Sequence, residues 1–484
     1  MDEDVDIEDN LEENIKNFAR LTAELQWITL LKIKDKDKKM SLIEQIEDEV
    51  ERAYLIQYTV FKDEDKIKLI KNLTNRRAIL IIISSLQNEE LKKEFIENTL
   101  DENEKVYILD TIQHSKDKSW IMEQSEKIKS PISRAYLIGN MKNYESMQIK
   151  VETIQDLVTE LIDVKNCEKG KYERIGIDPK ITVGIEIEAE GMWSQLIKNY
   201  EKKIWNWKVK DDGSLIEGIE LISPPFIDKK ICVSEIYQIL TMMNKLGLET
   251  NERCGGHVHI GANYLENIEQ YKEFFEIYGN AEKIIYLIAN KPGELPRKSA
   301  KDYARPISVK WKEKNSKYKE PTKKDEFIKI AKEIQVKAKD YSLNIRNVGS
   351  ENKDTIEFRA SNGTLDGDIW VENIKLYARI MQSAKEIAKI KEKHKNGEEI
   401  TDDEQAKIIA KYKLKHTNSD DEKMSSLMEL LFDEDEREVY WERYNKNREL
   451  AEKTHFFDDW KFGKVDCKKI FKKPEQPEQP DNER

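Results

Sequence analysis

Two histidines stand two residues apart between glycines at residues 254–261, which read CGGHVHIG. Side chains at this spacing point to the same face of a β-strand, so the segment predicts a strand with the imidazoles of His257 and His259 side by side. The glycines let other groups approach the strand backbone closely. Such a pair can bind a metal, hold a phosphate or transfer a proton, and it can equally be structural. The surrounding segments decide between these roles.

An acidic strand is predicted before this pair. Residues 181–190 alternate between apolar and acidic side chains, so Glu186, Glu188 and Glu190 share one face of a strand. Three carboxylates on one face repel each other unless cations are present, and hard divalent cations take oxygen ligands. A solvated sheet face would show the same alternation. The segment therefore predicts either a metal site or an exposed strand face.

A hairpin is predicted between these two strands. Residues 211–214 read DDGS, and Asp-Gly is a strong hairpin signal. An apolar alternation follows at residues 219–225, which is typical of the second strand of a hairpin. This arrangement places Asp212 at a strand end and Glu220 on the neighbouring strand.

Two later segments add cationic side chains. Residues 298–326 are basic with interspersed aromatic residues. We expect Arg297, just before this segment, and Arg305, within it, to contact an anion. A solvated insertion would have the same composition. A further strand places Glu357 and Arg359 on one face. Helices are expected at residues 230–246, 265–289 and 368–393, the last capped by Asp368.

The first 165 residues are predicted to be helical and repetitive. A phrase of one basic and several apolar residues recurs, and the second residues of its copies lie 25, 28 and 29 positions apart. One helix pair per copy fits this spacing, and such pairs stack into a solenoid that presents a surface to a partner. A plain helical bundle is the alternative. The copies are RAYLI at 52–56, RAILI at 77–81, KVYIL at 105–109 and RAYLI at 134–138.

The composition bounds the class of protein. The chain has 484 residues and a net charge of −12, which disfavours a generic nucleic-acid binder. Its four cysteines form no CxxC pair, which argues against a disulfide framework or a structural zinc site. The N-terminus lacks a signal-peptide pattern, and the most apolar stretch is too short to span a bilayer. We therefore expect a soluble, cytoplasmic protein that binds neither membrane nor nucleic acid.

Six short motifs occur in a specific order. Together they resemble the putative amidoligase family, which belongs to the carboxylate–amine ligase superfamily with glutamine synthetase and glutamate–cysteine ligase. Each motif alone is weak, but their order is a specific signal, and the resemblance covers about residues 180–393. The motifs are GIEIE at 184–188, DGSL at 212–215, GIELISPP at 218–225, GGHVHIG at 255–261, LN at 343–344, and TIEFR at 355–359 followed by GTLD at 363–366.

The resemblance implies a fold and a reaction. The fold is α+β, with a glutamine-synthetase-like antiparallel sheet curved around the site and helices packed outside it. In the reaction ATP phosphorylates a carboxylate, and an amine attacks the acyl phosphate to give an amide or isopeptide bond. The carboxylate and amine can belong to a protein or peptide that the N-terminal repeats recruit. We expect a helical repeat domain at 1–165, a linker at 166–180, a catalytic domain at 181–460 and a disordered tail at 461–484.

The reaction needs Mg²⁺ or Mn²⁺ to neutralise the phosphates. The expected hard oxygen ligands are Glu186, Glu188, Glu220 and Glu357. One histidine is expected to join a metal or the phosphates. His259 is the first candidate for that place, with His257 the next candidate and otherwise a catalytic group.

Other residues are expected to act on the substrates. Arg359 would hold the γ-phosphate or the acyl phosphate with its planar guanidinium fork. Arg297, Arg305 and Ser214 would contact the ATP phosphates. Asp212 would orient or deprotonate the amine.

Two other classes of function compete with the ligase. A metal-dependent hydrolase would use the same carboxylates with His257 and His259 to activate water. A non-enzymatic scaffold would use the repeats alone. The carboxylate-rich ligand set and the lack of a cysteine cluster favour Mg²⁺ over Zn²⁺ and hence the ligase, and the presence of every acidic motif residue argues against the scaffold.

Overall fold

The computed structural model describes residues 11–21, 23–59, 62–112, 118–130, 170–191, 207–314, 317–335 and 338–471, together with positions 133, 134, 136, 137, 194, 197 and 198. The chain forms two compact units. The first comprises Met1–Cys167, Ala189–Leu221 and Thr241–Glu249, and the second comprises Glu168–Glu188, Ile222–Leu240 and Thr250–Arg484.

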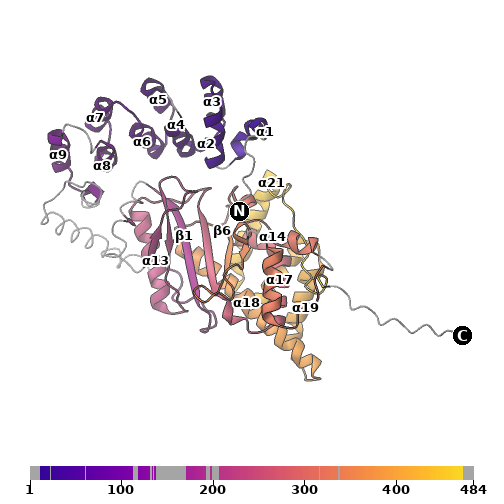
Figure 1. Ribbon diagram of the computed structural model, residues 1–484. Helices are drawn as coiled ribbons and strands as arrows, with labels where there is room; N and C mark the ends of the chain where they lie inside the picture. Colours follow the sequence, from indigo (N-terminus) through magenta and orange to yellow (C-terminus); the bar gives the residue numbers. More distant parts are fainter. Residues whose placement is uncertain are drawn as a thin grey trace. The chain divides into compact units, whose positions relative to one another are not determined.

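The described N-terminal residues form short α-helices that follow one another along the chain (Figure 1). Asp48, Asn75, Asn88 and Asp101 cap α4, α6, α7 and α8 by accepting hydrogen bonds from backbone N–H groups of the first turn. The first three copies of the predicted phrase lie on α4, α6 and α8, and the copy at 134–138 falls partly outside the described residues. The helices are α1 (Leu11–Lys16), α2 (Ala23–Lys32), α3 (Lys36–Ile43), α4 (Glu49–Tyr58), α5 (Asp63–Ile70), α6 (Arg76–Ser84), α7 (Glu89–Asn98), α8 (Glu102–Thr111) and α9 (Lys118–Glu126), with η1 (Phe18–Arg20) after α1.

One type of contact recurs between these helices. Glu49, Asp63 and Glu102 each begin a helix, and each carboxylate accepts hydrogen bonds from two successive backbone N–H groups that lie 24 to 28 residues later. Contacts of this kind, formed at similar intervals, are typical of repeats. The repeat architecture and the stacking of the helices into a solenoid both stay predictions.

The core of the first unit includes a residue from outside the N-terminal helices. Ile216 is buried among apolar side chains that lie between Phe18 and Ile82. Arg77 on α6 donates a hydrogen bond to the carbonyl oxygen of Ile216 and lies 3.1 Å from the Glu190 carboxylate and 3.0 Å from that of Glu249. The helices are thus tied to residues 189–221 and 241–249 of their own unit.

The strands of the described residues form one six-stranded sheet in the order β2-β3-β1-β4-β6-β5. β1 pairs antiparallel with β4, β4 with β6, and β6 with β5. The predicted mixture of N-terminal helices and an antiparallel sheet is confirmed, and a glutamine-synthetase-like curvature stays a prediction. The strands are β1 (Val183–Glu190), β2 (Lys208–Lys210), β3 (Gly218–Ile222), β4 (Gly255–Gly261), β5 (Leu343–Asn344) and β6 (Thr355–Asn362).

The connection between β2 and β3, which are neighbours in the sheet, contains the predicted turn at residues 211–214. β2 ends at Lys210 and β3 begins at Gly218. Asp212 accepts hydrogen bonds inside this connection, and Ile216 leaves it to enter the core of the first unit. The Asp-Gly signal therefore marks a turn, but burial of Ile216 lengthens the loop around it.

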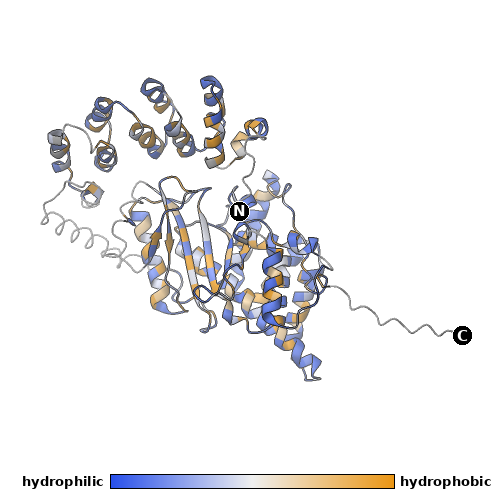
Figure 2. Cartoon of the chain, viewed as in Figure 1, coloured by the Kyte–Doolittle hydropathy of each residue, from blue (hydrophilic) through white to orange (hydrophobic). Residues whose placement is uncertain are grey.

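Helices α14 and α18 pack against each other and against the apolar face of β6 (Figure 1). Phe358 stacks on Tyr377 of α18 with ring centroids 4.4 Å apart and meets Phe274 of α14 at 6.1 Å. Glu357 and Arg359, which flank Phe358 in sequence, therefore point to the other face. Figure 2 shows hydrophobic and hydrophilic residues interspersed along the helices of the protein. The helices of the second unit and its borders are α13 (Lys230–Lys245), α14 (Ile268–Ile288), α15 (Ala300–Tyr303), α16 (Ser308–Glu313), α17 (Lys324–Ile334), α18 (Gly367–Lys395), α19 (Asp402–His416), α20 (Asp420–Leu431) and α21 (Glu438–Thr454), with η3 (Ala262–Tyr264), η4 (Ala338–Asp340) and η5 (Glu434–Glu436).

The predicted cap of α18 is displaced by two residues. The carboxylate of Asp366, rather than that of Asp368, accepts hydrogen bonds from the N–H groups of Asp368 and Ile369. Because the helix begins at Gly367, Asp366 has the extended backbone that an N-cap requires. No helix in the described parts of the chain combines the length and the apolar character that crossing a membrane requires.

Residues of the predicted linker (166–180) and of the predicted tail (461–484) form hydrogen bonds within the second unit. The Asp228 carboxylate accepts hydrogen bonds from the backbone N–H groups of Ile175, Gly176 and Ile177 at 2.8, 2.8 and 3.2 Å. The amide of Asn280 on α14 pairs with the backbone of Val465 at 2.8 and 3.2 Å. Residues 474–481, where the tail sequence is richest in proline, lie outside the described residues.

Candidate active site

Titratable side chains gather on the sheet face opposite α14 and α18. Glu186 of β1 stands opposite His257 of β4, and His259 of β4 stands opposite Glu357 of β6. Directly opposed residues in an antiparallel pair share a face and lie close together. The register therefore assembles carboxylates and imidazoles from three neighbouring strands.

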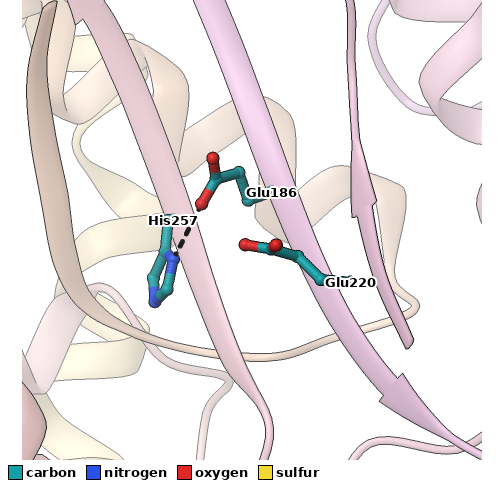
Figure 3. A group of neighbouring side chains, drawn as sticks. All are labelled: Glu186, Glu220 and His257. Carbon is teal, nitrogen blue, oxygen red and sulfur yellow. Dashed lines mark hydrogen bonds and ion pairs between the residues drawn. The ribbon is translucent and has the colours of Figure 1, made fainter. Parts of the chain in front are cut away.

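The Glu186 carboxylate lies between two imidazoles. Its Oε2 is 3.3 Å from Nδ1 of His257, and its Oε1 is 3.2 Å from Nε2 of His259. Figure 3 shows the contact with His257 and the carboxylate of Glu220 beside it. Burial opposes ionisation, but the two imidazoles hold the pKa of Glu186 well below its ordinary value. Glu186 is thus a half-buried carboxylate that stays charged.

The Glu357 carboxylate has a partner at each oxygen. Its Oε2 accepts a hydrogen bond from Nδ2 of Asn344 at 2.7 Å, and its Oε1 accepts one from Nη1 of Arg359. The same Oε1 lies 3.7 Å from Nδ1 of His257. Burial raises the pKa of Glu357, but the neighbouring His257, Arg359 and His259 side chains outweigh burial and lower it.

The two histidines differ in the partners of their Nε2 atoms. Among the described residues, Nε2 of His257 makes no hydrogen bond, whereas Nε2 of His259 lies 3.2 Å from the Glu186 carboxylate. A buried polar atom left unpaired costs about 1–3 kcal/mol, so a ligand that takes its lone pair is favoured. Burial lowers the pKa of His259, but its contact with Glu186 and the charge of Glu357 raise it overall. A cation would have to displace the proton that this raised pKa favours on His259, and the grouped carboxylate and imidazole atoms supply the ligands for it.

Two groups of these side chains could each hold one metal ion. One is Glu186, His259 and Glu357, and the other is Glu186, Glu220 and His257; in each group the ligand atoms lie within 4.8 Å of one another. Glu220 comes from β3, the neighbour of β1 in the sheet. Carboxylate oxygens with one imidazole nitrogen suit Mg²⁺ or Mn²⁺. Glu186 belongs to both groups and could bridge two ions.

Glu188 shares the acidic strand but belongs to neither group. Its Oε2 accepts a hydrogen bond from the backbone N–H of Gly255, and its Oε1 lies 3.7 Å from Nε2 of His257. A side chain at Gly255 would come within 2.9 Å of Arg297 and 3.1 Å of Glu188, so this glycine is needed where both side chains approach the strand. Arg297 is buried and donates to the carbonyl oxygen of Ser361 at 2.7 Å. Burial lowers the pKa of Arg297, and the charge of Glu188 partly offsets this.

Three other predicted residues have partners outside the two cation groups. Nη2 of Arg305 lies 3.2 Å from the Asp340 carboxylate, and its guanidinium lies over the ring of Tyr341 at 5.2 Å. Asp212 accepts hydrogen bonds from the backbone N–H and the hydroxyl of Ser214 at 2.7 and 2.6 Å. None of the three predicted residues, Arg305, Asp212 and Ser214, is a member of a cation group in the described residues.

Sequence reasoning gave no role to Asn344. The pair Leu343-Asn344 was recognised as a motif, but a strand of two residues carries no periodicity that would assign its face. The structure places Asn344 opposite Glu357 on the edge strand β5. The signal that could have identified it is a buried amide beside a predicted metal-binding carboxylate, because such ligands usually have an outer partner.

The geometry agrees with one comparison to known proteins. A family model described as "putative amidoligase enzyme" matches residues 195–381. The matched segment contains Glu220, both histidines, Glu357 and Arg359, and it begins after Glu186. A search of curated proteins found no match. Residues 195–381 are therefore similar to the putative amidoligase family, and this match confirms the resemblance indicated by the motifs.

Proposed function

We propose that the protein is an ATP-dependent carboxylate–amine ligase that forms an amide or isopeptide bond through an acyl phosphate. The family match suggests an amide-forming ligase. The observation that carries the proposal is that the half-buried, ionised Glu186 belongs to two groups that could each hold a cation. Phosphoryl transfer asks the protein mainly to position phosphates and to neutralise their charge, which is what such a site would do.

The cation ligands in this proposal are Glu186, Glu220, Glu357 and the two histidines. Mg²⁺ or Mn²⁺, when bound, would neutralise the nucleotide phosphates and the developing charge of the transferred group. The lowered pKa values of Glu186 and Glu357 keep both carboxylates ionised at neutral pH. Glu188, which contacts the Gly255 backbone, would support the strand beside Arg297 rather than bind a cation.

Arginines would bind the anionic side of the reaction. The side chain of Arg359 is 16% exposed, so its guanidinium can reach a phosphoryl group while its base stays fixed on β6. Arg297 is 4% exposed and donates a hydrogen bond to the backbone of β6. It would therefore contribute its positive charge to anion binding from a buried position. Ser214 and Arg305 as contacts for the nucleotide, and Asp212 as the group that orients the amine, are proposals that rest on their motifs alone.

We further propose that the N-terminal helices recruit a protein or peptide that carries one of the substrates. Leu31 of α2 is 53% exposed and Tyr58 of α4 is 46% exposed. Tyr58 lies against Trp27 and Tyr54 with ring centroids 5.9 and 4.8 Å apart. Aromatic side chains held together at a surface supply contact area at a low entropic cost, which supports a role in binding.

The test is the formation of ADP from ATP and Mg²⁺ with mixtures of carboxylates and amines, read together with mass spectra that detect loss of water between two substrates. We expect ADP only when both substrates are present. Glu186→Gln should reduce the rate to background, whereas Glu333→Gln, which alters an exposed carboxylate on α17, should leave it unchanged. Substrate cleavage without ATP would instead support the hydrolase, and full activity of Glu186→Gln would contradict the assigned site.

A further inference from the structure

We propose that Asn344 and Arg359 are positioning residues that act on the cation site in opposite directions through Glu357. Asn344 fixes the carboxylate as a cation ligand, and Arg359 competes with the cation for the same carboxylate. The inference rests on the proposed function, because it assumes that Glu357 binds a cation. It adds an order of binding, in which the cation releases Arg359 to meet the anionic group.

Asn344 is built to hold one oxygen of Glu357 in place. Its side chain is buried, and its Nδ2 donates to Oε2 of Glu357 at 2.7 Å. Its own Oδ1 accepts a hydrogen bond from the backbone N–H of Arg346 at 2.9 Å, which determines that the NH₂ end of the amide faces Glu357. A neutral donor orients the carboxylate without cancelling its charge. Loss of such an outer partner typically costs 10- to 100-fold in metal affinity.

Arg359 holds the other oxygen with a full positive charge. Its Nη1 donates to Oε1 of Glu357, and its Nε donates to the carbonyl oxygen of Tyr303 at 3.3 Å. Its Nη1 also lies 3.5 Å from Nδ1 of His257. A guanidinium cannot lose its proton in a protein, so a cation bound at Glu357 meets an unavoidable like charge. Cation binding should therefore loosen the Arg359–Glu357 pair.

The order of binding follows from these two contacts. Arg359 cannot hold Glu357 and a phosphoryl group with the same fork at full strength. Once a cation replaces it at Glu357, the guanidinium is free to turn toward an anion. A chain that has bound no cation would thus keep its phosphate-binding arginine engaged, which couples anion binding to prior cation binding.

Mn²⁺ affinity of the full chain, measured by calorimetry without nucleotide, tests the inference. Asn344→Ala should weaken Mn²⁺ binding by about 10- to 100-fold. Arg359→Met should strengthen it by about threefold or more, because one positive charge leaves the carboxylate. Arg379→Met removes a positive charge that lies 3.7 Å from the Glu436 carboxylate and should leave the affinity within about twofold of the wild type. Circular dichroism checks each fold, and Asn344→Ser replaces Asn344→Ala should the latter not fold.

The Mn²⁺ affinities test the roles of Asn344 and Arg359 separately from the proposed ligase function. Weaker Mn²⁺ binding by Arg359→Met would show that Arg359 orients Glu357 instead of competing with the cation. Unchanged binding by a folded Asn344 variant would remove its positioning role. A wild-type chain that binds no Mn²⁺ overturns the proposed function itself, whereas a wild-type chain that binds Mn²⁺ with no difference among the variants overturns only the inference.

Discussion

Three carboxylates of the second unit that lie wholly or partly inside the protein have different hydrogen-bond partners. Glu186 lies between imidazoles, and Glu357 is held by one amide and one guanidinium. Glu282 on α14 instead accepts hydrogen bonds from the backbone N–H groups of Ile307 and Ser308 at 2.8 and 3.1 Å. Positive partners lower the pKa of the first two, whereas only neutral donors face the third. Burial therefore dominates at Glu282 and raises its pKa to about 7.

The raised pKa of Glu282 predicts a loss of stability toward neutral pH. The unfolded chain titrates near the ordinary value of 4.5, so between that value and about 7 the folded state binds the extra proton. The stabilisation is complete below pH 4.5 and is lost as the pH rises through about 7. It amounts to about 3 kcal/mol at most.

Urea unfolding of the wild type and of Glu282→Gln at about pH 5 and about pH 8 measures this effect. The wild type should lose more stability between the two pH values than the variant, because Gln does not titrate. Other groups titrate in both proteins and cancel in the difference. Equal losses in the two proteins would show that Glu282 keeps an ordinary pKa.

At the scale of strands, alternation predicted which side chains share a face but could not predict their register. The acidic strand, the histidine strand and the Glu357 strand all carry their polar residues on one face, as the sequence indicates. Because Glu186 pairs with His257, Glu188 lies beside Gly255 and accepts a hydrogen bond from its backbone N–H. The two acidic residues therefore have different roles: Glu186 is a candidate cation ligand, and Glu188 contacts the backbone. Register depends on contacts between distant segments, which local periodicity does not encode.

The same limit explains the β2–β3 loop and the role of Asn344. The Asp-Gly signal predicted the turn between β2 and β3 but not the burial of Ile216 among helices that lie more than a hundred residues earlier in the chain. The strand β5 is too short to show a period, so only the structure brings Asn344 to Glu357. By contrast, the recurring phrase correctly marked α4, α6 and α8, because helix spacing is a local property.

The close packing of β4 predicts a strict need for glycine at position 256. A Cβ atom there would lie 2.6 Å from the carbonyl oxygen of Asn362 and 3.0 Å from the ring of Trp370. Gly256→Ala should therefore destabilise the protein by about 1–3 kcal/mol. Gly184→Ala on β1 is a matched control, since its Cβ would meet only ordinary contacts at 3.7 and 3.8 Å. Thermal unfolding of both variants decides the matter, and equal melting temperatures would contradict the packing argument.

At the scale of the whole chain, the first unit is not made of the N-terminal helices alone. Arg77 joins α6 to Glu190, Glu249 and the backbone of Ile216. Glu190 is fully buried and also accepts a hydrogen bond from the N–H of Ile216 at 2.7 Å. Removal of the helices would expose Ile216 and leave a buried carboxylate without its cation. The helices are therefore expected to be required for stability as well as for any recruitment.

Arg77→Met should destabilise the protein strongly, because it leaves Glu190 charged and buried. Breaking a buried ion pair in this way typically costs about 3–5 kcal/mol. Lys127 is the control: its side chain and that of its partner Glu123 are 59% and 63% exposed, so Lys127→Met should leave the stability nearly unchanged. Urea unfolding compares the two variants, and similar losses would mean that Arg77 is not the residue that ties the helices to residues 189–249.

The number of Mn²⁺ ions bound per chain, counted by electron paramagnetic resonance of the free ion, tests whether Glu186 belongs to a shared cation site. The two groups that share Glu186 predict two ions for the wild type. Glu186→Gln should lose or greatly weaken both, while Glu220→Gln and His259→Ala should each lose one, and the exposed Glu333→Gln should keep two. Two ions bound to Glu186→Gln with wild-type affinity would contradict the shared cation site and the ligase mechanism proposed from it.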